Sequence, residues 1–489
     1  MTLRLHNTLT RSTEPFDPLE PPHVRVYACG PTVYQVPHIG NYRTFVFNDV
    51  LRRYLHWKGF DVRFVMNLTD VDDKTIDGAT DQGIALEDYT APIIEAFLAG
   101  LRVLGVGDGV LFPRATRHIG EMVELIARLL ERGHAYQADD GSVYFDISSF
   151  PDYGRLSRID LVETRAGAGL ARRERDRVSA DEYDKSDARD FVLWKAARER
   201  DRAVGAVWST PWGEGRPGWH IECSAMSMGA LGETFDIHTG GEDLVFPHHE
   251  DEIAQSEAAT GKPFVRYWLH VKHLLVDGAK MSKSKGNDFK LDQLLELGHT
   301  PAAIRYLLLS AHYRSELNFT LDGLSDARAA LRRIADFRDR LAAPQPPWRS
   351  PAPDSSGPAT LQAAAERALQ NFEAALDVDL NTPGALAAVF GFVREGNAAL
   401  DRGAVPEVQK AAALHTIERM DQVLGLLQLE DARATVDHDF AAWVEDRLAR
   451  RRAARAARDF ATADAIRDEL ATAGVVVEDT PQGARWKKQ

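Results

Sequence analysis

Apolar and polar residues alternate with two different periods in the first 70 positions. Residues 24–29 alternate as in a β-strand, residues 41–57 carry apolar side chains four apart as in a helix, and residues 62–66 form a second strand. Gly59 provides a suitable stop after the helix. A strand, a helix and a strand in this order predict a βαβ unit, which begins a doubly wound parallel sheet.

The pattern changes further along the chain. Residues 150–200 are charged and irregular and indicate an insertion, whereas residues 235–238 return to a strand pattern. The Pro-rich segment 344–358 predicts an interdomain linker, because it cannot form regular structure. Beyond it nearly every segment is helical. The helices and the further strand predicted from the pattern are 93–101, 122–130, 247–260, the strand 271–276, and then 361–376, a helix starting at the Asn381–Pro383 cap, 406–427, 438–458 and 460–473.

Composition narrows the class of protein. A chain of 489 residues suggests about three domains, and 44% hydrophobic with 27% charged residues is ordinary for a globular protein. No apolar run approaches a membrane span and no secretory signal opens the chain, so we expect a cytoplasmic protein. The net charge of −14 is unlike that of a dedicated nucleic-acid binder, so contact with RNA would be confined to a limited surface.

One short motif suits phosphate at the start of the first helix. A helix N-terminus offers free N–H groups and a partial positive charge, and Gly40 lets a nucleotide approach the backbone closely. His38 and Asn41 are three residues apart and can face the same ligand. Taken alone, the motif is explained better by helix capping.

A second motif is the basic loop 280–286. Lys280 and Lys283 stand among small hydroxyl residues in a loop that ends at Gly286, a composition that suits a polyphosphate gaining charge during reaction. A solvated basic loop is the common alternative.

The only two cysteines are candidate metal ligands. His248 and Glu252 are four apart on a predicted helix, so their side chains share one face. With Cys29 and Cys223 they would offer two sulfurs, an imidazole and a carboxylate, a set that suits tetrahedral zinc. His249 competes with His248, and two unrelated buried thiols remain an alternative because the spacing is not that of a Cys-x-x-Cys site.

Arginines gather on a predicted helix near the C-terminus. Arginines with nearby aromatic residues such as Phe460 and Trp486 suit RNA backbone contact and base stacking, although a solvated helix face is the simpler explanation. The arginines are Arg447, Arg450, Arg451, Arg452, Arg455 and Arg458.

The order of these motifs is more specific than any one of them. A His-Ile-Gly helix start followed, at the end of the same fold, by a Lys-Met-Ser-Lys-Ser loop resembles the class I aminoacyl-tRNA synthetases. Asn41 stands where the usual motif has a second histidine; it can donate hydrogen bonds but cannot carry charge. The segments that are similar to the cysteinyl-tRNA synthetase family, and that extend the resemblance over nearly the whole chain except 344–358, are 27–34, 67–74, 218–224, 246–250 and 470–486.

The resemblance implies a plan for the whole chain. It implies an α/β protein with a doubly wound, Rossmann-like catalytic domain over 1–343, which contains an inserted connective region near 120–215 and a lysine-loop segment over 270–330. The linker 344–358 and an α-helical anticodon-binding domain over 359–489 would follow.

The resemblance also implies a reaction: ATP-dependent activation of L-cysteine to cysteinyl-adenylate, and its transfer to the 3′-terminal ribose of tRNA(Cys). We expect a monomer whose partners are tRNA(Cys), ATP and L-cysteine, with no membrane contact. The residues that the resemblance assigns are His38, Asn41, Lys280 and Lys283 for catalysis; His38, Gly40, Asn41, Gly240, Gly241, Asp243 and Lys283 for ATP; Thr69 and Trp219 for the amino-acid pocket; and Arg455, Phe460, Asp464 and Asp479 for the anticodon.

One zinc ion per chain, held by the four candidate ligands, would take the substrate sulfur as a fifth ligand. Size alone separates cysteine from serine poorly, whereas zinc accepts a thiolate readily. Mg²⁺ would accompany ATP, and Asp70, Asp72 and Asp73 are explained equally well as turn and capping residues. Two alternatives stay open: a cysteine ligase of thiol biosynthesis, which residues 359–489 disfavour, and a non-catalytic tRNA- or zinc-binding paralogue, which the intact lysine loop and ligand set disfavour.

Overall fold

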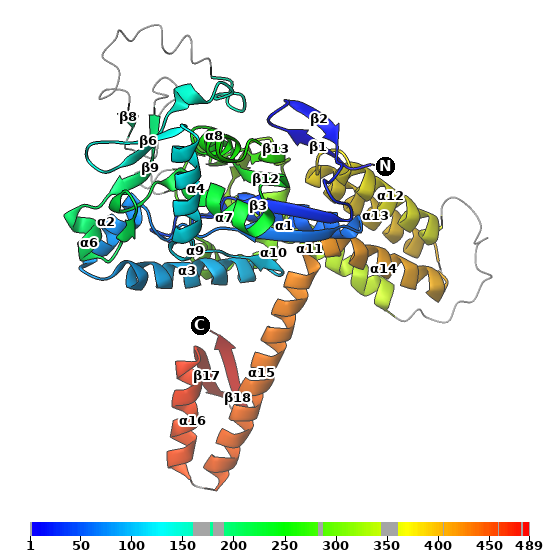
Figure 1. Ribbon diagram of the computed structural model, residues 1–489. Helices are drawn as coiled ribbons and strands as arrows, with labels where there is room; N and C mark the ends of the chain where they lie inside the picture. Colours follow the sequence, from blue (N-terminus) through cyan, green and yellow to red (C-terminus); the bar gives the residue numbers. More distant parts are fainter. Residues whose placement is uncertain are drawn as a thin grey trace. The chain divides into compact units, whose positions relative to one another are not determined.

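The computed structural model describes residues 2–159, 177–178, 190–281, 287–343, 360–403, 405–457, 459–480 and 483–488 (Figure 1). The chain divides into two compact units, Met1–Leu426 and Leu427–Gln489. None of the helices in these ranges is long and apolar enough to cross a membrane.

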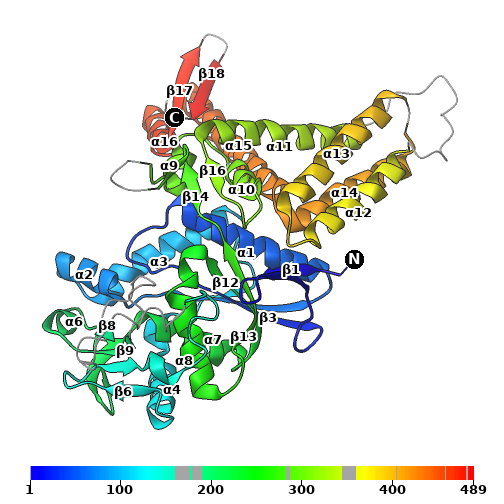
Figure 2. The same cartoon turned by 90° about the horizontal axis from the view of Figure 1, so that it is seen from above.

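A five-stranded parallel sheet in the order β13–β12–β3–β4–β5 forms the core of the first unit. The strands are β3 (His23–Ala28), β4 (Asp61–Met66), β5 (Val110–Leu111), β12 (Phe235–Gly241) and β13 (Val265–Val271). The central strands are almost wholly buried because helices cover both faces, α1 (Ile39–Trp57) on one side and α7 (Trp219–Leu231) with α8 (His248–Thr260) on the other (Figures 1 and 2). The predicted doubly wound parallel sheet is confirmed.

The strand order reverses between β3 and β12, and this determines where a ligand site is expected. The chain runs from β3 through α1 to β4 on one side, while β12 pairs with β3 on the other. In open α/β sheets, ligands bind at the carboxyl ends of the strands beside such a switch point. Cys29 directly follows β3, and Gly241 ends β12 at the same edge.

A second, mostly antiparallel sheet is inserted between β5 and β12. Its order is β10–β11–β9–β7–β6, with β8 pairing β9 in parallel. The sequence indicated only irregular structure over 150–200, but β9 is a regular strand whose residues 191–195 are all buried, so it lacks the alternation that marks a half-exposed strand. Its elements are β6 (Ala135–Gln137), β7 (Val143–Phe145), β8 (Arg177–Val178), β9 (Asp190–Ala196), α6 (Glu199–Ala203), β10 (Trp208–Thr210) and β11 (Gly213–Pro217).

Helices and short strands complete the first unit. The Asn381 side chain accepts the Gly384 N–H (3.0 Å), which confirms the predicted cap, and α12 has the predicted bounds. The predicted linker 344–358 lies outside the described residues. The remaining elements are β1 (Arg4–Asn7), β2 (Ser12–Pro15), α2 (Asp73–Gln82), α3 (Leu86–Val103), η1 (Ala115–Arg117), α4 (Ile119–Glu131), η2 (Ile147–Ser149), η4 (Glu242–Val245), β14 (Leu274–Val276), β15 (Ala279–Lys280), α9 (Leu291–Glu296), α10 (Pro301–Leu309), β16 (Leu317–Phe319), α11 (Leu321–Ala342), α12 (Leu361–Leu376), α13 (Thr382–Asp401) and α14 (Glu407–Leu424).

The second unit is a small helical body that ends in a hairpin. Helix α15 (Leu427–Ala456) is followed by α16 (Phe460–Thr472) and the antiparallel strands β17 (Val475–Thr480) and β18 (Gly483–Lys488). Its core residues are Val444, Leu448, Ile466, Leu470 and Val475. The sequence placed the start of this helix at 438, eleven residues late, and did not predict the hairpin.

Candidate functional site

Four side chains predicted as metal ligands converge at the carboxyl edge of the parallel sheet. Cys29 follows β3, Cys223 lies on α7, and His248 and Glu252 lie one turn apart on α8. All four are buried, and one ligand atom from each lies within 4.8 Å of the others. The two Sγ atoms are 3.8 Å apart, and His248 Nε2 is 3.0 Å from Glu252 Oε1. The donor set of two sulfurs, one imidazole and one carboxylate fits a tetrahedral dication site.

The electrostatics of this cluster favour a cation. Burial raises the pKa of Glu252, but His238 and His248 outweigh this effect and lower it to about 2. Burial also raises the pKa of Cys223, but the hydrogen bond with Cys29 and the nearby His248 leave it lowered overall. The cluster therefore brings a carboxylate and an acidified thiol into a water-poor interior, where negative charge requires a partner.

Three further histidines lie around the same centre. His238 Nε2 is 2.9 Å from Glu252 Oε2, and His249 Nε2 is 3.3 Å from Cys29 Sγ. His249 Nδ1 in turn lies 2.8 Å from His270 Nε2. His238 and His249, with Cys29 and Glu252, make a second group whose ligand atoms are equally close together. Burial lowers the pKa of His249 far below its usual range, so its imidazole is neutral at pH 7.

The residues expected in the amino-acid pocket lie next to the cluster. The Trp219 ring stacks on that of His248 with centroids 4.2 Å apart. Thr69 follows β4, is buried, and accepts a hydrogen bond from Asn67 Nδ2 (3.1 Å). Its backbone pairs with Thr32, in the turn after Cys29. Thr69 thus lies in the loop after β4, and Trp219 begins α7.

The structure also brings the start of the lysine loop against the first helix. His38 is the N-cap of α1, and its backbone N–H donates to Asn41 Oδ1 (3.2 Å). A Cβ added to Gly40 would come within 2.3 Å of Met281 Cε, so the start of the lysine loop lies directly against Gly40. The Ile39 N–H donates to the Phe289 carbonyl (2.8 Å), so the segment that follows the loop is hydrogen-bonded to the start of α1. Lys280 is exposed at the end of β15, and Lys283 lies outside the described residues.

The expected adenosine segment lies at the same edge. Gly240 and Gly241 end β12, and Asp243 follows in η4. A Cβ on Gly240 would lie 2.7 Å from the His249 ring, and one on Gly241 would lie 2.3 Å from Asp243 Oδ1. Gly240 therefore needs to be glycine because the buried His249 ring fills the space beside it, whereas the Asp243 side chain could move away from a Cβ at position 241.

The acidic residues after β4 have structural partners. Asp70 accepts the Thr116 backbone N–H (2.8 Å) and hydroxyl (2.7 Å), and Asp72 caps α2 by accepting the Lys74 N–H (2.8 Å). Asp73 pairs with basic side chains of the inserted sheet. Asp70 and Asp72 thus have the turn and capping contacts that the sequence left open, whereas Asp73 forms ion pairs, which the sequence did not predict.

In the second unit, three residues expected at an anticodon surround one turn. Arg455 is in the last turn of α15, Phe460 begins α16, and Asp464 lies one turn further; all three are exposed. Phe460 exposes 62% of its surface, which is unusual for an aromatic residue. The side chain of Asp479 lies outside the described residues.

Family models match most of the chain. The model "tRNA synthetases class I (C) catalytic domain" matches residues 15–329, "DALR domain" matches 371–428, and "Cysteinyl-tRNA ligase anticodon binding domain" matches 437–486. The cysteine–tRNA ligase of Solibacter usitatus is 48% identical over 490 residues, covering 100% of both chains. That of Protochlamydia amoebophila is 44% identical over 488 residues, covering 100% of this chain and 98% of the relative. The chain belongs to the cysteine–tRNA ligase family.

Solved structures place this cysteine–tRNA ligase family member in the class I fold. Mycobacterium tuberculosis methionyl-tRNA synthetase in complex with methionyl-adenylate superimposes with a TM-score of 0.57 at 16% identity, covering 83% of this chain and 90% of that one. The Agrobacterium radiobacter LeuRS–tRNA–LeuAMS complex gives 0.60 at 14% identity, covering 85% and 86%. At these identities the likeness is one of fold alone.

Three histidines around the metal cluster of this cysteine–tRNA ligase family member were not predicted from the sequence. His238 and His270 lie on the neighbouring parallel strands β12 and β13, and His220 Nδ1 contacts His248 Nδ1 at 2.9 Å. The presence of His238 and His270 on strands next to the switch point was the sequence signal that could have indicated them. That both lie at one centre depends on the register between β12 and β13, which the sequence pattern does not give.

Proposed function

We propose that this protein activates L-cysteine with ATP and transfers it to the 3′-terminal ribose of tRNA(Cys), and that a zinc ion selects the thiol. The observation that carries the proposal is the convergence of Cys29, Cys223, His248 and Glu252 at the carboxyl edge of the parallel sheet, at the switch point between β3 and β12. Membership of the family supports the reaction. The soft thiol ligands with an imidazole support zinc rather than a hard cation.

Selectivity would follow from the chemistry of sulfur. Bound zinc would offer a coordination position that a thiolate fills readily and a protonated alcohol fills poorly. Trp219 and Thr69 would form the walls that hold the substrate backbone. Since a hydrophobic pocket distinguishes close analogues by only about 1–3 kcal/mol, this chemical difference supplies discrimination that shape cannot.

The first step needs positioning and charge stabilisation more than covalent chemistry by the protein. The cysteine carboxylate attacks the α-phosphorus of ATP and pyrophosphate leaves with its electron pair. His38, Gly40 and Asn41 would hold the phosphates at the start of α1, where N–H groups favour anions. Lys280 and Lys283 would stabilise the charge that develops on the phosphorane and on pyrophosphate. Gly240, Gly241 and Asp243 would contact adenosine, and Mg²⁺ would enter with ATP.

In the second step the terminal ribose hydroxyl of tRNA(Cys) attacks the adenylate carbonyl and AMP leaves. The exposed turn that carries Arg455, Phe460 and Asp464 would contact the anticodon, together with Asp479. Aromatic stacking and arginine contacts suit unstacked RNA bases. We further propose that the protein acts as a monomer in the cytoplasm.

The test is cysteine-dependent exchange of labelled pyrophosphate into ATP, followed by charging of tRNA(Cys), with the full chain. We expect exchange with cysteine, little exchange with serine, and charging of the tRNA. Exchange without charging would indicate a cysteine ligase of thiol biosynthesis. Absence of exchange with bound zinc and intact tRNA affinity would indicate a non-catalytic binding protein.

A further inference from the structure

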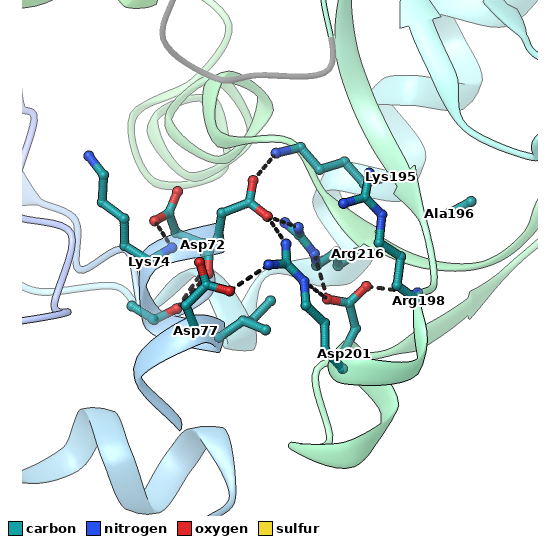
Figure 3. A network of polar contacts seen from close by, with 12 residues as sticks. Asp72, Lys74, Asp77, Lys195, Ala196, Arg198, Asp201 and Arg216 are labelled. Atoms are coloured by element: carbon teal, nitrogen blue, oxygen red, sulfur yellow. Dashed lines mark hydrogen bonds and ion pairs between the residues drawn. The ribbon is translucent and has the colours of Figure 1, made fainter. Parts of the chain in front are cut away.

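A partly buried group of ion pairs lies between the inserted sheet and the loop that carries Thr69, and its centre is Asp73, the first residue of α2, whose side chain is 35% exposed. The Asp73 carboxylate accepts hydrogen bonds from Lys195 on β9 (2.6 Å), from Arg200 on α6 and from Arg216 on β11. Lys195 and Arg216 reach from the inserted sheet toward α2 (Figure 3). The group therefore joins the inserted sheet to the end of the catalytic sheet.

The residues of this group differ in how deeply they are buried. Arg216 is 1% exposed and also lies 3.3 Å from Asp201, itself 1% exposed. Asp77, one turn along α2, pairs with Arg200 and is more exposed than Asp73 (Figure 3). Burial raises the pKa of Asp73, but Lys195, Arg216 and Arg200 outweigh it and lower the pKa to about 2. The Asp73 carboxylate is thus ionised at neutral pH and balances the largely buried cations of Lys195 and Arg216.

Each residue of the Asp73–Arg216 ion pair is close in sequence to one of the two residues proposed for the amino-acid pocket. Asp73 is four residues after Thr69, and only the loop that ends with the Asp72 cap separates them. Arg216 is three residues before Trp219, because β11 runs through Gly218 straight into α7. The next helical turn of α7 carries Cys223.

Helix α7 also packs against β4, the strand that leads to Thr69, and Glu222 on α7 is fully buried. Trp219 stacks on His248, so a shift of α7 would move Trp219 and the metal cluster together. The start of α7 and the loop after β4 are therefore joined both by the packing of α7 on β4 and by the ion pairs of Asp73.

We infer that Asp73 is a positioning residue, which, through Arg216 and Lys195, sets the distance between Thr69 and Trp219 and thereby the affinity for the amino acid. The inference rests on the proposed function. It assigns to Asp73 no contact with substrate. A displacement of about 1 Å in a positioned reactant can cost about a hundred-fold in rate, so a small relaxation of this border is measurable.

The test compares Asp73→Asn with Asp77→Asn in pyrophosphate exchange. Both substitutions remove one carboxylate charge from α2, but only the first removes a carboxylate paired with Arg216, which keeps Asp201 as its other partner. We expect Asp73→Asn to raise the KM for cysteine about ten-fold while the KM for ATP changes less than about two-fold, and Asp77→Asn to change neither. Asp73→Glu, which restores the charge, should recover most of the cysteine affinity.

The outcomes separate this inference from the proposed function. Absence of cysteine-dependent exchange in the unaltered chain would remove the proposed function. Normal exchange in the unaltered chain, with equal changes in both KM values or with no change in Asp73→Asn, would overturn the positioning role alone. If Asp73→Asn does not fold, Arg216→Lys takes its place, because lysine keeps the charge but loses the planar fork. An unchanged KM for cysteine in that variant would equally overturn the inference.

Discussion

Replacing Cys223 by serine changes one atom of the metal cluster and tests its chemistry. The side chain is 1% exposed on α7, so the substitution alters the ligand without opening a cavity. A zinc site in a small zinc-binding peptide is worth about 10–16 kcal/mol, or about 2.5–4 kcal/mol for each of four ligands. Since every 1.4 kcal/mol is a factor of ten, the Kd for zinc should rise about 60- to 700-fold in Cys223→Ser.

Competition with a chromophoric chelator measures this Kd, and exchange assays with cysteine and serine measure selectivity in the same preparation. Cysteine activation should fall toward that of serine, because the thiol loses its preferred partner. Ser227→Ala, one turn further along α7 and also buried, is the control and should keep zinc affinity within about two-fold, since its hydroxyl donates to the Ser224 carbonyl and to no metal ligand among the described residues. Unchanged zinc affinity and unchanged selectivity in Cys223→Ser would refute the assignment.

Three further predictions address other parts of the account. Lys283→Ala should lower kcat for exchange about 100- to 1,000-fold, as loss of one charge-stabilising donor does, and a kcat equal to that of the control Lys262→Ala would contradict its role. Zinc binding at pH 7 should release about two protons, which calorimetry in two buffers measures. Burial lowers the pKa of His248, but Cys223 and Glu252 raise it to about 10, and burial raises the pKa of Cys29, so both side chains are protonated before zinc binds. Zinc affinity should therefore rise as the pH is raised above 7, and a pH-independent affinity would count against the ligand set. Phe460→Ala should raise the KM for tRNA about ten-fold or more with exchange unaltered, because a stacked base contributes about 1–3 kcal/mol; an unaltered KM for tRNA would count against this contact.

Local pattern was enough to predict the parallel sheet. The alternation over 24–29 and the four-residue spacing over 41–57 correspond to β3 and α1, because each depends on residues close in sequence. The pairing of His248 with Glu252 on one face of α8 followed from the same helical geometry. Cys29 and Cys223, 194 residues apart, could be joined to them only through resemblance to a family.

What the sequence did not predict depends on long-range register. His238 and His270 come to one centre because β12 and β13 are neighbours in the sheet. The ion pairs of Asp73 join residues 122 to 143 positions apart, and in the sequence each is an ordinary charged residue. The hairpin of β17 and β18 follows α16 after only a short turn, so the sequence pattern did not separate its strands from the helical domain predicted over 359–489.

Zinc K-edge X-ray absorption on the purified zinc-bound chain, with and without cysteine, tests most directly whether the cluster grips the substrate sulfur. Cys29 and Cys223 predict two sulfur neighbours at about 2.3 Å in the free protein, and bound cysteine should add a third, whereas serine should not. Two sulfur neighbours both with and without cysteine would contradict the account.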